Sequence, residues 1–359
     1  MRFATIDILR IGRAQFVLLL VFMGALALMA SCDVHEFPSV PTHTDAVLHL
    51  HFSTDMPQTD YVVSRGSETR IDFSPVRNEG VMRCIVRLYP KTTEKSANTT
   101  TLYKEYVTTR DVADGYDFDM TIDAPVGDYT VMAWADLADE TYNTTLFYDA
   151  GDFGGITLSG NYQGSTDYRD AFRGTTTVNI TATEDEQPAV EATLDMERPL
   201  AKFEFVANDL RAFMEQQSMV AESKAKQKAK DATSRSVSLD DFQLVFSYNG
   251  YMPCTYSMVT DKPVDAKTGV TFRGKISQLS DDEASLGFDY VFVNHQATEV
   301  TVQLGIYDYD GNLISVSDPV NVPLQRSKHT IVRGAFLTQK STGGVSINTT
   351  YDGDYNITF

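Results

Sequence analysis

The sequence predicts an all-β protein made of two β-sandwiches in series. Apolar and polar residues alternate in many short segments, and turn-forming residues separate these segments. Alternation with a period of two gives a strand one apolar face, and many short strands of this kind are typical of sandwiches. Glu197-Arg198-Pro199 interrupts the pattern and divides the strands into two groups. The interruption is expected because proline lacks a backbone donor and keeps the preceding residue extended.

Residues 1–31 have the pattern of a signal peptide. A basic head precedes an apolar run, residues 16–30, that has the length of a signal-peptide core and is shorter than a membrane-spanning helix. Small residues stand immediately before Cys32, as in a lipobox, where the thiol takes a diacylglycerol before the leader is cleaved. We therefore expect the mature protein to begin at a lipidated Cys32. An ordinary secretory signal with a chance cysteine is the alternative.

Residues 32–45 predict an extended tether, because they contain two prolines and few apolar side chains. A first domain, residues 46–197, is expected to form the N-terminal sandwich. Its strands are expected where the alternation is most regular: residues 48–53, 82–88, 116–123 and 190–197. Trp134 is the only tryptophan, and its place on a strand at residues 129–136 favours core packing over stacking against sugars.

The second domain, residues 198–359, is expected to carry one helical insertion, residues 209–236. Four residues recur there at helical spacing: Leu210, Phe213, Met214 and Gln217. Lysines then recur through residues 222–230. A basic run in an acidic protein is a candidate docking patch, but no aromatic or apolar partners accompany it, so we favour a solvated helix end.

The other strands of the second domain are expected in these segments: residues 201–205, 242–248, 300–306, 313–316, 345–349 and 355–359. The pair Asn249-Gly250 predicts a hairpin turn with positive φ. Residues 308–312 contain two aspartates, a glycine and an asparagine. A calcium loop would need a distal bidentate glutamate that this order lacks, so a tight turn is expected there.

The composition and the missing motifs limit the function. A net charge of −19 argues against nucleic acid and anionic lipid surfaces as ligands, because like charges repel. The sequence has no nucleophile elbow, no phosphate-binding glycine loop and no zinc-spaced set of cysteines and histidines. His49 and His51 share one face of a strand, but no third ligand is evident and a solvent face explains them. We therefore expect no enzyme, no cofactor and no metal.

Two cysteines remain in the chain after Cys32. Cys84 and Cys254 both stand among apolar residues, which predicts buried free thiols. A disulfide joining the two domains is the alternative, because export would permit it although the spacing does not demand it.

Three segments carry motifs of a known family. Residues 124–136 contain a proline and glycine turn before Tyr-Thr-Val-Met-Ala-Trp, residues 198–205 read Arg-Pro-Leu-Ala-Lys-Phe-Glu-Phe, and residues 322–359 contain Arg-Ser-Lys-His-Thr and Tyr-Asp-Gly-Asp. Their order and spacing resemble those of the fimbrillin-like lipoproteins that build and anchor type V fimbriae of gut and oral bacteria. Ser327 stands where that family usually has asparagine.

The resemblance implies two transthyretin-like (Greek-key) sandwiches and assembly by strand exchange, in which one subunit fills a groove in its neighbour. In that family, stalk subunits are cut after an arginine near the N-terminus, which removes the lipid and the first strand, whereas anchor subunits keep both. Arg65 and Arg70 lie in a polar stretch where such a cut is expected, and a plain surface loop is the alternative. In a donor strand, the residues that fill the pockets of the neighbouring subunit would be Tyr351, Tyr355, Ile357 and Phe359. These residues fit a last core strand of the same chain equally well.

The function that follows is that of a fimbrium-associated cell-surface lipoprotein, a structural, anchoring or accessory subunit with a role in adhesion. Its lipid is expected to hold it at the outer membrane and cell surface, with other fimbrial subunits as partners and a host or bacterial surface ligand as a further partner. A glycan-binding lipoprotein of a polysaccharide-uptake system is the alternative, since leader, strands and many tyrosines fit it too. A hydrolase ranks lowest, because it would need a clustered carboxylate pair in a cleft.

Overall fold

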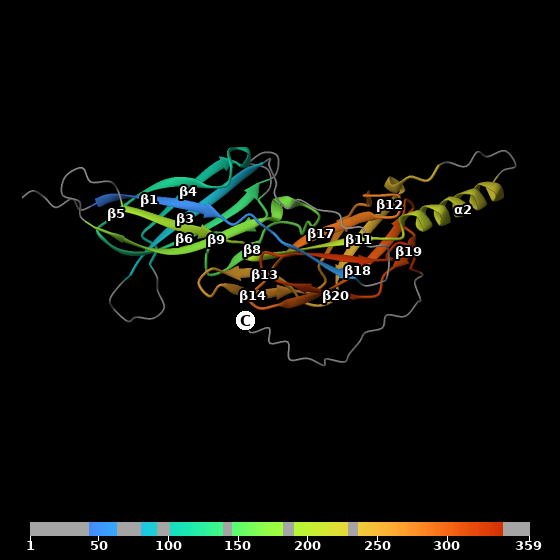
Figure 1. The fold of residues 1–359 in the computed structure, drawn as a ribbon. Coiled ribbons are helices and arrows are strands. Elements are labelled where there is room, and N and C mark those ends of the chain that lie inside the picture. Colours follow the sequence, from blue (N-terminus) through green and yellow to red (C-terminus); the bar gives the residue numbers. More distant parts are fainter. Residues whose placement is uncertain are drawn as a thin grey trace, which may run out of the picture.

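The computed structural model confirms the all-β class. It describes residues 43–62, 80–91, 101–138, 146–181, 190–228 and 236–339. Within these ranges the chain forms strands β1–β21 and one α-helix, α2 (Leu210–Lys228), where the helical insertion is expected. The molecule is elongated, with one group of sheets at each end and a small sheet between them, and α2 projects from the far end (Figure 1).

Two sheets at one end enclose the first core. One has the order β10-β1-β5 and the other the order β4-β3-β6-β9. Their bounds are β1 (His43–Phe52), β3 (Val81–Pro90), β4 (Lys104–Asp111), β5 (Phe118–Pro125), β6 (Gly127–Ala138), β9 (Ala171–Ile180) and β10 (Val190–Met196). We call the apolar cluster between them the N-terminal core; it includes Leu48, Val86, Val131, Phe172 and Leu194.

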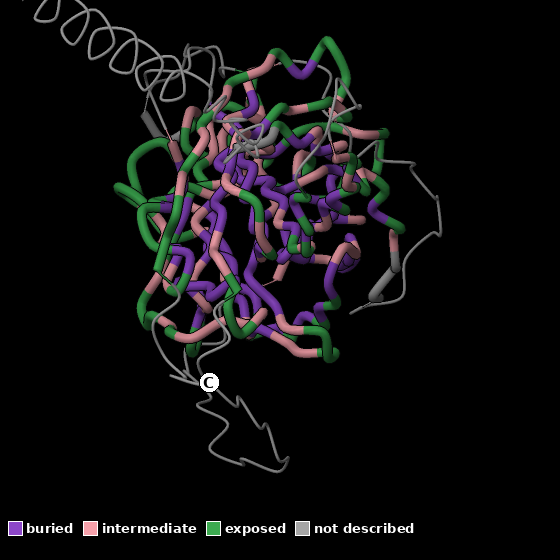
Figure 2. The backbone as a smooth tube through the Cα atoms, turned by 90° about the vertical axis from the view of Figure 1, so that its left-hand side faces the viewer, coloured by how far each residue is buried: buried purple, intermediate pink, exposed green. Residues whose placement is uncertain are grey.

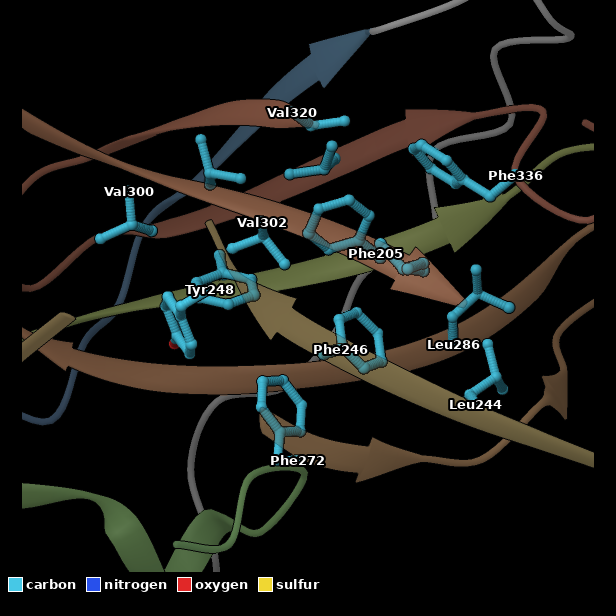
Figure 3. Close-up of a cluster of buried hydrophobic side chains, with 14 of the residues drawn as sticks. Phe205, Leu244, Phe246, Tyr248, Phe272, Leu286, Val300, Val302, Val320 and Phe336 are labelled. Atoms are coloured by element: carbon cyan, nitrogen blue, oxygen red, sulfur yellow. The ribbon is translucent and has the colours of Figure 1, made fainter. Parts of the chain in front are cut away.

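Two further sheets enclose the second core. One has the order β16-β17-β11-β21-β2, and the other the order β15-β12-β18-β19 with β20 paired to β18. Their bounds are β2 (Gln58–Val62), β11 (Leu200–Ala207), β12 (Phe242–Tyr248), β15 (Thr271–Gly274), β16 (Ser277–Gln278), β17 (Ala284–Phe292), β18 (Thr298–Asp308), β19 (Leu313–Val316), β20 (Val320–Leu324) and β21 (His329–Gly334). We call their cluster the C-terminal core, and Figure 3 shows Phe205, Phe246 and Phe272 at its centre.

A four-stranded sheet lies between these two groups. It has the order β14-β13-β8-β7, with β7 (Tyr148–Asp149), β8 (Ile156–Leu158), β13 (Met252–Ser257) and β14 (Lys262–Lys267). A third apolar cluster, the middle cluster, packs here and includes Trp134, Tyr148, Tyr256 and Phe292. Trp134 is fully buried in it, so its expected role in core packing is confirmed.

Burial follows the expected alternation in most strands. Leu48, Leu50 and Phe52 of β1 are buried while the residues between them are partly or fully exposed. Figure 2 shows this pattern across the molecule, with buried residues inside and exposed residues at the outer turns. Strand β11 differs because all eight of its residues are buried. It lies in the interior of its sheet between β17 and β21, so Lys202 and Glu204 are covered as well.

The prediction of a hairpin at Asn249-Gly250 is wrong. Strand β12 before it pairs with β15 and β18, whereas β13 after it pairs with β14 and β8, so the two strands lie in different sheets. Gly250 also has no positive φ. The chain crosses between sheets at this point, and a crossing does not need the tight turn of a hairpin.

The turn at residues 308–312 is confirmed as the link between the paired strands β18 and β19. Gly311 has a φ of 82°, a conformation that glycine adopts at little cost. Both carboxylate oxygens of Asp308 accept hydrogen bonds from the side-chain amide of Asn312, at 3.1 and 3.0 Å. The carboxylate oxygens of Asp308 therefore stabilise the turn.

Some boundaries differ from the expected ones. Strand β1 already begins at His43, inside the stretch expected to be a tether. Three strands that precede Glu197 lie in sheets with later strands: β2 pairs with β21, β8 pairs with β13, and β7 joins that sheet through β8. The division of the chain into domains at residues 197 and 198 stays a prediction.

Both cysteines in the described ranges are free and buried. Cys84 belongs to the N-terminal core and Cys254 to the C-terminal core, so the alternative of a disulfide between them does not occur. Burial raises the pKa of the Cys84 thiol to about 12, because a thiolate is poorly solvated in an apolar core.

Helix α2 is packed against the body through its first turns. Leu210 and Phe213 are buried in the C-terminal core, whereas Met219 is 65% exposed. In the parts of the chain that the structure describes, no helix combines the length and the apolar character that a membrane span requires.

Candidate assembly site at the N-terminal segment

The candidate site is the seat of the N-terminal segment, which we define as residues 43–62. The segment comprises β1, a connection at residues 53–57, and β2. It is the part of the described chain that lies between the expected lipid attachment at Cys32 and the expected cleavage positions. Figure 1 shows it in blue, running from one end of the molecule past the middle. It therefore touches both groups of sheets.

Strand β1 is the central strand of its sheet. It pairs parallel to β10 and antiparallel to β5, so that Leu48 faces Ala192 on one side and Met120 on the other. The ring of Phe52 meets the ring of Phe172 edge-on at 5.2 Å. Because both edges and the apolar face of β1 are engaged, removing it would expose a long apolar groove and two rows of backbone groups.

The outer face of β1 is polar. The His49 Nδ1 lies 2.7 Å from the Asp119 Oδ1, and the His51 Nδ1 lies 2.8 Å from the Asp117 Oδ2. All four side chains are more than one-third exposed. Among the residues that the structure describes there is no group of three potential metal ligands. The two histidines thus lie on a solvent face, as expected.

Residues 53–57 are held by buried groups where the two groups of sheets meet. The Ser53 backbone N–H donates to the Met196 carbonyl at 2.9 Å, and the Pro57 carbonyl accepts from the His329 N–H at 3.0 Å. Between these points, the Arg198 Nη1 donates to the carbonyls of Ser53, Thr54 and Asp55 at 3.2, 2.8 and 3.2 Å. The connection is therefore bound through its main chain.

Arg198 is itself fixed in place. Its Nε and Nη2 donate to the two Asp170 carboxylate oxygens, each at 2.8 Å. The guanidinium lies over the Phe172 ring at 4.6 Å, and the residue is 1% exposed. Burial acts to lower the pKa of Arg198, but the charge and hydrogen bonds of Asp170 outweigh it and raise the pKa above its ordinary value.

A second buried ion pair holds the same junction. The Arg169 Nη1 lies 2.8 Å from the Asp289 Oδ1 of β17, and both residues are at most 3% exposed. The hydroxyls of Tyr162 and Tyr248 donate to the other Asp289 oxygen. Burial raises the pKa of the Asp289 carboxyl, although Arg169 and the tyrosines act against this shift. Arg169 precedes β9 in the chain, so the pair joins the two groups of sheets.

A third, more exposed cluster converges on Asp261 in the turn between β13 and β14. Its carboxylate accepts from Arg173 of β9, from Tyr256 and from His295, and from the Arg326 Nη1 at 3.0 Å. Asp261 has a φ of 55°, which is uncommon for a residue with a side chain. The cluster adds a further link between β9 and the second group of sheets.

The residues predicted from sequence motifs are not among those that the structure describes. The positions outside the described residues are the lipidation site, the two cleavage candidates and the donor-strand candidates: Cys32, Arg65, Arg70, Tyr351, Tyr355, Ile357 and Phe359. Arg198 was not predicted to be a binding residue, because Glu197-Arg198-Pro199 predicts only an interruption between strands. An arginine at such a break, within an otherwise apolar pattern, was the available signal.

A protein-family model matches most of the chain. A family model described as "Family of unknown function (DUF6562)" matches residues 41–359. A search of curated proteins finds no match.

The chain also matches solved bacterial structures, all at low identity. The fimbrial anchor protein Mfa2 from Porphyromonas gingivalis is 11% identical with a TM-score of 0.35, covering 76% of this chain and 82% of that one. A fimbrial assembly protein from Parabacteroides distasonis is 13% identical with a TM-score of 0.34, covering 84% and 92%. A candidate polysaccharide-binding protein from Bacteroides thetaiotaomicron is 11% identical with a TM-score of 0.39, covering 76% and 79%.

Proposed function

The chain belongs to DUF6562, a family of unknown function, and we propose that it is a fimbrium-associated lipoprotein of the cell surface. It acts as a structural, anchoring or accessory subunit with a role in adhesion, and it is not an enzyme. Its lipid attaches it to the outer membrane through Cys32, and its partners are other fimbrial subunits. The three sequence motifs, the leader and the all-β fold support this proposal.

The observation that carries the proposal is the order of features in the first 70 residues. The candidate lipid site, Cys32, comes first, the N-terminal segment follows, and Arg65 and Arg70 come next. The segment supplies a central strand to one sheet and an edge strand to another. A cut at either arginine would therefore separate the lipid and both strands from the rest of the chain.

The two fates of this segment correspond to two roles. If the chain stays intact, the protein keeps its lipid and a filled N-terminal core, as an anchoring subunit requires. If it is cut and the segment leaves, β5 and β10 lose their common partner and β21 loses β2. Open edges of this kind take up an extended strand from another chain, because backbone hydrogen bonds supply affinity and alternate side chains fill pockets.

Deletion of the gene in the native bacterium tests the proposal. We expect fimbriae to be lost, detached or altered in length under the electron microscope, and the tagged wild-type protein to co-purify with fimbrial subunits from sheared surface material. A Cys32→Ser variant should fail to restore the wild-type fimbriae, whereas Cys254→Ser, a change at a buried thiol, should restore them. Unchanged fimbriae in the deletion strain, together with no co-purifying subunit, would rule the proposal out.

A further inference from the structure

We infer that Arg198, positioned by Asp170, is a receptor for the main chain of an extended polypeptide segment. In this structure its ligand is residues 53–55, and in an assembled fimbrium it is the main chain of a second copy in the same seat. The binding of a second copy rests on the proposed function, whereas the binding of residues 53–55 rests on the observed contacts alone. The receptor is a binding site, distinct from the apolar groove that β1 fills.

The contacts are made entirely to carbonyl groups. Three successive carbonyl oxygens converge on the Arg198 Nη1 at 2.8 to 3.2 Å. Residues 53–57 belong to no strand, so these oxygens lie outside the ladders of both sheets. Carbonyls in such a place need a donor, and a cationic donor forms stronger hydrogen bonds than a neutral one.

The side chains of the bound residues point away from the receptor. Ser53 and Asp55 are exposed and Thr54 is partly exposed, whereas Met56 is buried in the middle cluster. The receptor therefore does not depend on which side chains stand at these positions. Any segment that follows the same path with its carbonyls toward Arg198 satisfies it.

The Arg198 side chain is also held by groups other than its ligand. Asp170 is 4% exposed, and its Oδ1 accepts the Ala171 backbone N–H at 3.0 Å. Arg198 follows Glu197, whose backbone N–H and C=O both pair with Arg173, at 2.9 and 2.8 Å. The ion pair and the backbone bonds between Glu197 and Arg173 thus involve no atom of residues 43–62. The segment reaches this backbone two residues earlier, where Met196 accepts the Ser53 N–H. A donor held in place in this way loses little entropy when a segment binds.

Hydrogen exchange of the full mature chain, followed by mass spectrometry, tests the inference without any fimbrial partner. In Arg198→Lys the positive charge remains beside Asp170, but the planar guanidinium that reaches the three carbonyls is lost. We expect backbone amides of residues 53–62 to exchange about tenfold faster than in the wild type, while amides of β3 and β6 keep their rates. Arg198→Met should show the same local effect more strongly.

Two control variants separate a local loss of binding from a general loss of stability. Arg169→Met removes another buried arginine, whose hydrogen bonds go to Gln163, Asp289 and Tyr290, and should speed exchange on both sides of the junction without a selective effect on residues 53–62. Ser53→Ala/Asp55→Ala changes exposed side chains only, and should leave exchange unchanged. Uniformly faster exchange in Arg198→Lys would show a purely structural ion pair and overturn the inference, as would loss of protection in the double alanine variant. Neither result depends on whether the protein belongs to a fimbrium.

Discussion

Leu48→Asp is expected to unfold the N-terminal core. Leu48 is fully buried in the centre of β1, between Met120 and Ala192 on the neighbouring strands. Truncation of a buried leucine to alanine already costs about 2–5 kcal/mol, and an unpaired carboxylate in an apolar core adds a further penalty. The combined loss takes a large part of the roughly 5–15 kcal/mol that holds a typical domain together. Denaturant titration followed by circular dichroism measures it.

The adjacent residue supplies the control. His49 lies on the same strand with its side chain on the solvent face, and threonine suits an exposed strand position, so His49→Thr should change the free energy of unfolding by no more than about 0.5 kcal/mol. A loss below about 1 kcal/mol in Leu48→Asp would mean that β1 is not an integral strand of the core. In that case, the N-terminal segment would be an extension of the tether, and its removal would open no groove.

Asp289→Ala is expected to destabilise the junction between the two groups of sheets. The change leaves Arg169 buried without its carboxylate partner and deprives the hydroxyls of Tyr162 and Tyr248 of their acceptor. Breaking a buried ion pair on one side typically costs about 3–5 kcal/mol. We expect a loss of this size in chemical denaturation.

An exposed ion pair provides the matched comparison. Arg211 and Asp282 are more than half exposed, so Asp282→Ala should cost at most about 1 kcal/mol, because water and salt screen the pair. The double variant Arg169→Met/Asp289→Ala should recover part of the loss, since no unpaired charge remains buried. Equal losses for Asp289→Ala and Asp282→Ala would show that the pair does not hold the junction.

The sequence predicted strands best where one face of a strand meets water. In β1 and β18 the apolar and polar residues alternate cleanly, because only one face of each sheet is covered. In β11 the same alternation is present, but β11 is an inner strand with both faces covered, so Lys202 and Glu204 are buried too. Alternation alone cannot reveal this, because a buried polar face depends on partners far away in the chain.

The candidate site could be predicted only in part for the same reason. Cys32, Arg65 and Arg70 follow from local patterns. The receptor, in contrast, brings Arg198 together with Asp170, which is 28 positions away in the sequence, and with Ser53, which is more than 140 positions away. No periodicity links such residues. Ser327 is a further example: its φ of 55° is a left-handed conformation that asparagine and glycine adopt more readily than serine, so no local pattern predicts it.

The mass of the mature N-terminus tests the central claim most directly. Intact-mass spectrometry of the protein from its native membrane, and from sheared surface material, reads the first residue and its modification together. We predict an acylated Cys32 with an intact chain in the membrane. Chains that begin at Gly66 or Ile71 in the sheared material would show in addition that the subunit is processed and polymerises. A chain with an unmodified Cys32, or one that still carries residues 1–31, would contradict a surface lipoprotein.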